Sequence, residues 1–198
     1  MVEVRREAEN ADDLSSALNA ARNGDEQAFR VVYRLVHPGL LRYVRVLVGE
    51  DAEDVVSEAW LQIVRDLSRF SGDGAAFRGW ASTIARHRAL DHLRHHRRRP
   101  ALATPPEEMP EPVTDKDAAE LALDGLSTDQ AVAMIASLPM DQAEAVMLRV
   151  VLGLDAQAAA KVLGKRPGAV RMAAHRGLRR LAENLRRPQR SEVGEHGE

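Results

Sequence analysis

The sequence predicts an all-α fold, in which two small helical domains are joined by a flexible, acidic, proline-rich linker. No segment alternates apolar and polar residues as a strand does, whereas apolar residues recur at helical spacing over most of the chain. Four prolines fall within residues 103–117, "ATPPEEMPEPVTDKD", and make a continuous helix there unfavourable. The linker should therefore lie between two helical units.

These breaks predict the domain boundaries. We expect an N-terminal extension with a short helix over residues 1–24, a first domain over 25–99, the linker over 100–127, a second domain over 128–187, and a polar tail over 188–198. One further short helix is expected near residues 117–124 of the linker.

In the N-terminal extension and the first domain, the breakers Gly24, Pro38–Gly39 and "SGDG" (71–74) separate the expected helices. The first helix covers about 12–22. The second starts after Asp25 and either continues beyond Pro38 or gives way to a following helix. The third covers 51–70, where Asp51 and Asp54 resemble a capping box. Its apolar face comprises Val56, Trp60, Ile63, Leu67 and Phe70. The fourth runs from Phe77 to His96.

The second domain should contain four helices, at about 128–137, 140–152, 155–163 and 167–186. The last two are separated by a turn with Gly164, and Pro167 suits the first turn of the final helix. This layout is a helix-turn-helix, whose second helix enters the major groove of DNA. The expected apolar stripe of the final helix comprises Val170, Ala174, Leu178 and Leu181.

The net charge of −2 conceals a strong segregation of charge. Residues 86–99 hold six arginines and one acid, residues 100–127 hold seven acids and one lysine, and residues 128–187 hold ten basic and five acidic side chains. Two basic regions separated by an acidic one indicate two surfaces that share an anionic partner.

Composition excludes several classes of protein. The chain has no cysteine, which excludes a disulfide scaffold and cysteine-based zinc sites. Its N-terminal residues lack the apolar core of a signal peptide, and no stretch approaches the length of a membrane span, so we expect a cytoplasmic protein without membrane insertion. No Walker loop, Rossmann fingerprint or nucleophile–base motif occurs, so we expect neither an enzyme nor a cofactor.

The stretch "FRGWASTIARHRALDHLRHHRRR" (77–99) combines aromatic, histidine and arginine side chains. Such a surface suits stacking on unpaired bases with neutralisation of their phosphates. Trp80 could stack on a base or seal the core beneath the helix. A metal site built from His87, His92, His95 and His96 is disfavoured, because there is no HExxH motif and no well-placed acid apart from Asp91. Asp91 should instead pair with Arg94, His87 or His95.

Two further segments suggest binding surfaces. In the last helix, Arg171 and its neighbours lie off the apolar stripe, where arginine can reach guanine edges or phosphates. In the 51–70 helix, Glu53 and Asp54 are favoured by the helix dipole, but Glu58 is not explained in this way. An acidic, partly apolar face of this kind suits docking to another protein.

Three segments occur in a fixed order along the chain. Two precede the linker, "DAEDVVSEAWLQIVRDLSRF" and the stretch 77–99, and one follows it, "LPMDQAEAVMLRVVLGLDAQAAAKVLGKRPGAVRMAAHRGLRRL". Together they resemble the extracytoplasmic-function (ECF) group of bacterial RNA polymerase sigma factors, over residues 25–187. The resemblance implies that the first domain is a sigma region 2 bundle and the second a sigma region 4 helix-turn-helix. It also implies an alternative sigma factor that directs core polymerase to promoters and assists transcription initiation.

The resemblance also implies roles for particular residues. Core polymerase would be contacted by Asp54, Val55 and Glu58, the −10 element by Trp80, Arg86, His87 and Arg94, and the −35 element by Arg171, Met172, His175 and Arg176. The implied partners are core RNA polymerase, through its β′ clamp helices and β flap, promoter DNA, and an anti-sigma factor.

The chain departs from the family pattern at three points, so the promoter sequence is not carried over. His87 stands where the family often has Asn, Ser57 where it often has Gln, and Met172–Ala173 where it often has Ser-Arg. Two other functions remain as alternatives: a stand-alone helix-turn-helix regulator, and a metal-dependent helical hydrolase that uses the histidine cluster.

Overall fold

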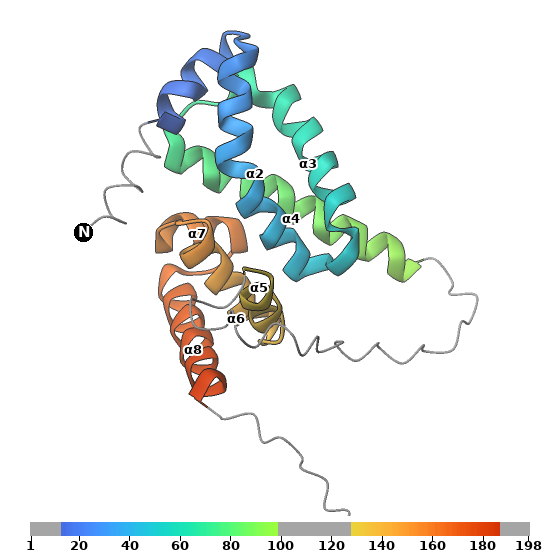
Figure 1. Ribbon diagram of the computed structural model, residues 1–198, viewed down its shortest axis with the longest axis vertical. Helices are drawn as coiled ribbons and strands as arrows, with labels where there is room; N and C mark the ends of the chain where they lie inside the picture. Colours follow the sequence, from blue (N-terminus) through green and yellow to red (C-terminus); the bar gives the residue numbers. More distant parts are fainter. Residues whose placement is uncertain (1–12, 99–127, 187–198) are drawn as a thin grey trace, which may run out of the picture.

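The computed structural model describes residues 13–98 and 128–186 (Figure 1). Within these two ranges the chain is helical and contains no strand, which confirms the predicted fold class. The expected linker, its short helix near 117–124 and the expected tail lie outside the described residues. We refer to residues 13–98 as the N-terminal lobe and to residues 128–186 as the C-terminal lobe.

The N-terminal lobe begins with a helix over residues 13–22, followed by α2 (Glu26–Val48), a short 3-10 turn η1 (Gly49–Asp51), α3 (Ala52–Asp66), a second 3-10 turn η2 (Leu67–Arg69) and α4 (Gly74–Arg98). The Asp25 carboxylate accepts the backbone N–H of Ala28 at 3.0 Å and so caps α2. Asp73 caps α4 in the same way, at 2.8 Å from the nitrogen of Ala76.

Helix α2 continues through Pro38, which settles the alternative left open by the sequence in favour of one helix. A proline inside a helix removes one backbone hydrogen bond. Buried side chains on both sides of it hold α2 against the rest of the molecule: Val32, Val36, Leu40, Tyr43 and Val44. Tertiary packing therefore outweighs the local cost of the proline.

The expected apolar face of the 51–70 segment spans α3 and η2 and ends at Phe70, and all five of its predicted members are buried. The predicted capping box at Asp51 is wrong. Asp51 occupies the N-cap position but makes no hydrogen bond that caps the helix. Its carboxylate lies 2.9 Å from Nε2 of His92 on α4 instead.

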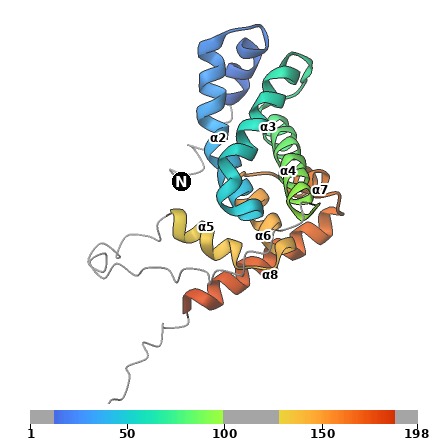
Figure 2. The ribbon, with the colours of Figure 1, turned by 90° about the vertical axis from the view of Figure 1, so that its right-hand side faces the viewer.

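The C-terminal lobe contains α5 (Thr128–Ala136), α6 (Met140–Val146) with the π-helical segment η4 (Met147–Val151), α7 (Ala156–Leu163) and α8 (Pro167–Arg186). Asp155 caps α7, and Gly164 ends it in the left-handed conformation, at φ 63°. Helix α8 lies on the side of this lobe away from α2 and α3 (Figures 1 and 2).

The predicted apolar stripe of α8 needs one correction. Leu178 is exposed, whereas Val170, Ala173, Ala174 and Gly177 are buried. A side-chain carbon added at Gly177 would lie 2.8 Å from Cγ2 of Val146 on α6. Because α6 and α8 approach each other so closely, the buried stripe of α8 is formed by small residues at this contact, and Leu178 lies beside the stripe and faces solvent.

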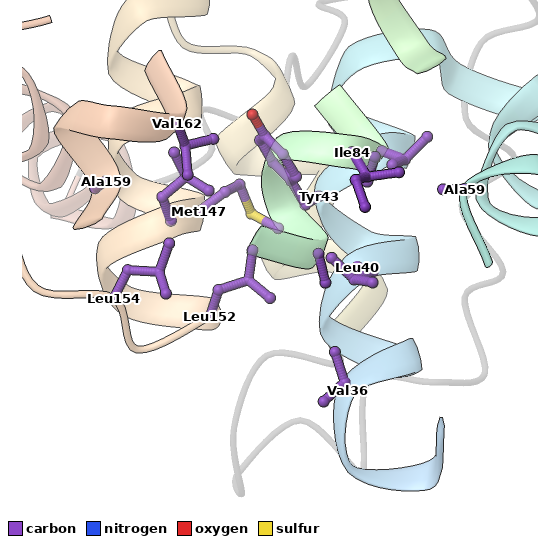
Figure 3. Close-up of a cluster of buried hydrophobic side chains, with 14 of the residues drawn as sticks. Val36, Leu40, Tyr43, Ala59, Ile84, Met147, Leu152, Leu154, Ala159 and Val162 are labelled. Carbon is purple, nitrogen blue, oxygen red and sulfur yellow. The ribbon is translucent and has the colours of Figure 1, made fainter. Parts of the chain in front are cut away.

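The two lobes pack against each other through a shared apolar core. Figure 3 shows Val36, Leu40 and Tyr43 of α2 and Ile84 of α4 facing a second group of side chains. That group belongs to the C-terminal lobe and comprises Met147, Leu152, Leu154, Ala159 and Val162. Helix α7 lies against α4, and α5, α6 and η4 contact α2. The two predicted helical units therefore form one closed structure.

Candidate nucleic-acid and protein interfaces

The helix-turn-helix presents a continuous exposed surface on α8. Arg171, Met172, His175 and Arg176 are all exposed. Their spacing places them on one side of the helix, opposite the buried stripe. Arg176 has a distant ionic neighbour, Asp141, at 3.9 Å, and both side chains are near half-exposed, so the guanidinium remains free to engage DNA. The structure thus brings together all four side chains for which the resemblance implied contact with the −35 element.

Helix α3 presents an exposed face that is acidic at one end and apolar at the other. Asp54 and Glu58 are exposed, as a docking surface requires. Val55 is buried, with 2% exposure, so its side chain supports the helix from within and does not lie on this face. Leu61 and Val64 continue the same face and are 64% and 52% exposed. Sequence reasoning missed these two, because an apolar residue in an amphipathic helix is usually assigned to the core.

The residues expected to contact the −10 element fall into two groups. His87 and Arg94 line an open cleft of about 410 Å³ on α4, together with Gln62 of α3 and Arg88. Arg88 donates two hydrogen bonds to the amide oxygen of Gln62, at 2.7 and 3.1 Å. This pair joins α3 to α4 and forms a polar part of the cleft wall.

Arg94 also pairs with Asp91, at 2.6 Å. Arg94 is one of the three partners that the sequence predicted for Asp91. His95 lies 3.0 Å from the backbone oxygen of Asp91. The Arg94 pair is exposed, so it is worth little in water and a phosphate can replace the carboxylate.

Trp80 belongs to the second group, at the boundary between the lobes. It stacks on Phe70 with ring centroids 5.0 Å apart and contacts Phe77 at 5.6 Å. It is only partly buried, because its other side borders a cleft of about 510 Å³ whose far wall includes Ala158 and Lys161 of α7. In this structure, Trp80 therefore seals the aromatic part of the core and faces the C-terminal lobe.

Arg86 forms an ion pair with an acidic side chain that no sequence pattern indicated. Its Nε donates to Oε1 of Glu144 on α6 at 2.7 Å. The Tyr43 hydroxyl donates to the same oxygen at 3.0 Å. The side chains of Arg86 and Glu144 are 19% and 7% exposed, so the pair is largely removed from water.

Burial and the contact with Glu144 together shift the pKa values of Arg86 and Tyr43. The hydrogen bond that Arg86 donates to Glu144 raises the pKa of Arg86, and burial raises the pKa of Tyr43 well above 10, with the negative charge of Glu144 adding to the effect. Arg86 therefore stays charged and Tyr43 stays a hydrogen-bond donor. Two helices of the N-terminal lobe thus hold one carboxylate of the C-terminal lobe.

Two family descriptions match this chain: sigma-70 region 2 over residues 29–99 and sigma-70 region 4 over residues 128–181. The ECF RNA polymerase sigma factor ShbA of Streptomyces griseus is 37% identical over 179 residues, which cover 85% of this chain and 93% of ShbA. The chain is an ECF sigma factor. Both regions occur in one polypeptide, which supports the sigma-factor interpretation over a stand-alone helix-turn-helix regulator.

Other relatives of this sigma factor are consistent with the assignment. ECF sigma factor SigD of Mycobacterium tuberculosis is 33% identical over 179 residues, covering 87% of this chain and 84% of SigD. Among solved structures, RpoE in complex with the anti-sigma factor NepR, from Bartonella quintana, matches with a TM-score of 0.61 and 21% identity, over 79% of this chain and 96% of that chain. This likeness supports the fold. None of the helices within residues 13–98 and 128–186 combines the length and apolar character of a membrane span.

Proposed function

We propose that this sigma factor docks on core RNA polymerase through the exposed face of α3, captures the unwound −10 strand with α4 and reads the −35 element with α8. The observation that carries the proposal is the presence of all three exposed surfaces in one chain of this family: Asp54 and Glu58 on α3, the His87–Arg94 cleft on α4, and Arg171 with its neighbours on α8. The sigma factor itself catalyses no reaction, and it acts in the cytoplasm, where polymerase and promoters meet.

The proposed division of labour follows the domain boundaries expected from the sequence. Residues 25–99 carry polymerase docking and −10 capture, and residues 128–187 carry −35 recognition. Residues 1–24 are an N-terminal extension, 100–127 a linker and 188–198 a tail. Two facts support this division: the family matches begin and end close to these limits, and the last helix of each matched region carries basic, exposed side chains.

The closed arrangement represents the form of this sigma factor that is not bound to polymerase. Two of the four proposed −10 contacts, Trp80 and Arg86, lie at the boundary with the C-terminal lobe. The guanidinium of Arg86 is hydrogen-bonded to Glu144. A DNA phosphate can make the same charge-assisted hydrogen bonds as a carboxylate. Promoter binding therefore requires the lobes to separate, and a DNA phosphate then replaces the Glu144 carboxylate as the partner of Arg86.

An anti-sigma factor is the proposed inhibitor of this chain. The fold is shared with RpoE, which was solved in complex with the anti-sigma factor NepR. The exposed apolar side chains of α3, Leu61 and Val64, offer a surface that such an inhibitor and core polymerase would both use.

The test is promoter-specific transcription. Purified sigma factor added to core polymerase should give run-off transcripts from a defined set of promoters. Duplex binding with repression and without such transcripts would instead support the stand-alone regulator.

The docking surface is tested with the double variant Asp54→Arg/Glu58→Arg, which should lose binding to core polymerase while its helical circular dichroism is retained. Glu183→Arg, an exposed charge reversal on α8, is the matched control and should keep core affinity. Wild-type affinity in the double variant would remove the docking assignment.

A further inference from the structure

Three potential metal ligands converge at the end of α4. His92 and His96 lie one helical turn apart, with ring centroids separated by 4.3 Å. Asp51, which ends the turn before α3, lies 2.9 Å from Nε2 of His92 although 41 residues separate them in sequence. One nitrogen or oxygen atom from each of the three residues lies within 4.8 Å of the others. Figure 1 shows the end of α4 passing the start of α3.

The donor set fits a borderline transition metal. Zn²⁺ binds imidazole nitrogen and carboxylate oxygen at about 2.0–2.2 Å, and three protein ligands with one water complete its coordination. In a tetrahedral site of that size the ligand atoms are about 3.3 Å apart. The His92–Asp51 pair is already near this separation, and His96 is exposed, so its side chain has room to rotate toward the other two donors.

The orientation of Asp51 distinguishes this cluster from an incidental surface ion pair. The residue stands at the N-cap position of α3, where a carboxylate ordinarily accepts backbone N–H groups. It makes no such bond and is directed at His92. The other two histidines of α4 behave differently, because His95 is bonded to the backbone of Asp91 and His87 lines the cleft beside Arg94.

We infer that Asp51, His92 and His96 form a binding site for a divalent transition-metal cation, represented by Zn²⁺, that joins the start of α3 to the end of α4. Sequence analysis disfavoured a metal site among the four histidines of α4, because the only acid near them in sequence is Asp91. The acid that completes the cluster, Asp51, comes from a distant turn. A bound cation would stiffen the connection between the helix that carries Asp54 and the helix that carries Arg94.

The experiment uses the full chain without a histidine tag, freed of metal by a chelator. Titration with Co²⁺, followed by its visible absorption, and calorimetric titration with Zn²⁺ should both give one bound cation per chain. His96→Gln and Asp51→Asn should weaken binding at least tenfold. His95→Gln and His87→Gln remove exposed histidines of the same helix and are the matched controls, which should bind as the wild type does.

Thermal unfolding supplies a second measurement, because a ligand that binds only the folded chain raises its Tm. Zn²⁺ should raise the Tm of the wild type and of His95→Gln, and at the same Zn²⁺ concentration should raise that of His96→Gln by less. Absence of binding in the wild type would overturn the inference. Equal affinity in His96→Gln and the wild type would do the same, since the cation would then be held elsewhere.

Discussion

Glu144 of α6 accepts a hydrogen bond from Arg86 of α4 at 2.7 Å, although 58 residues and the whole linker separate them in sequence. Tyr43 of α2 donates to the same carboxylate oxygen. The carboxylate is therefore held by both helices of the N-terminal lobe that face it. Removing one partner of a buried ion pair typically costs about 3–5 kcal/mol, because the remaining charge stays desolvated. We therefore expect Glu144 to contribute to holding the two lobes together, in addition to their shared apolar core.

Glu144→Gln should open the structure, because the neutral amide leaves the Arg86 charge without its counterion. The chain has no cysteine, so a pair of dyes can be attached at Ser68→Cys and Asn184→Cys, two exposed positions in different lobes. Energy transfer between the dyes should fall in Glu144→Gln, and affinity for single-stranded −10 DNA should rise. Glu183→Gln removes an exposed pair with Arg179 and should change neither. Unaltered energy transfer in Glu144→Gln would show that the apolar interface alone keeps the lobes closed.

Leu61→Ser should weaken binding to core polymerase about tenfold, as expected for the loss of an apolar contact at an interface. Because Leu61 is largely exposed in the free chain, the variant should keep its Tm. Leu185→Ser changes an exposed leucine on α8 and serves as the control. Affinity is measured by fluorescence anisotropy of labelled sigma factor. A parallel loss in both variants would mean that the effect is not specific to α3.

Arg171→Ala should cost about 1–3 kcal/mol of affinity for the preferred −35 duplex and relax the sequence preference at one base pair. Arg180→Ala, an exposed arginine nearer the end of the same helix, should instead weaken all duplexes alike and reduce the dependence on salt. Both effects are measured by titrating a set of single-substituted duplexes. A uniform loss for Arg171→Ala would reassign it as a phosphate contact.

Gly177→Ala should destabilise the C-terminal lobe by about 1–3 kcal/mol, because the added methyl group would enter the contact between α8 and Val146. Gly168→Ala is the matched control on the same helix, where the nearest atom to an added carbon is the mobile end of Arg171. That variant should be neutral or slightly stabilising, since alanine favours helices over glycine. Urea unfolding compares the two, and equal stability would mean that α6 moves aside without cost.

Acidification should destabilise the N-terminal lobe through His37. Burial lowers the pKa of His37 below its ordinary value of 6.5, with a smaller opposing effect from Glu53. Nδ1 of His37 lies 3.2 Å from Nε1 of Trp60 and accepts its hydrogen bond only when that nitrogen is unprotonated. The folded state therefore binds fewer protons than the unfolded state, so this contribution is complete above pH 6.5 and declines as the pH falls below it.

The comparison uses His37→Phe, which cannot titrate. Its Tm should fall less between pH 7.5 and pH 5.5 than that of the wild type. The same fall in both chains would assign the acid sensitivity to other groups.

The helices, the helix-turn-helix and the exposed reader surface could be predicted from the sequence, because each depends on residues within a few turns of one another. Asp25, Asp155 and Gly164 act on the backbone next to them, and the spacing of Val56, Trp60 and Ile63 defines one buried face wherever the helix packs. The motifs that indicated a sigma factor are local in the same sense. For this reason the family could be inferred before the structure was known.

Tertiary structure decided which surfaces are covered and which distant side chains meet. Periodicity shows that a face is apolar but not which neighbour covers it, so Val55 is buried while Leu61 on the same helix is exposed. Glu144 reached Arg86, and Asp51 reached His92, only because packed helices brought together segments 58 and 41 residues apart. Contacts over such separations depend on how whole helices pack, and no local pattern in the chain records that packing.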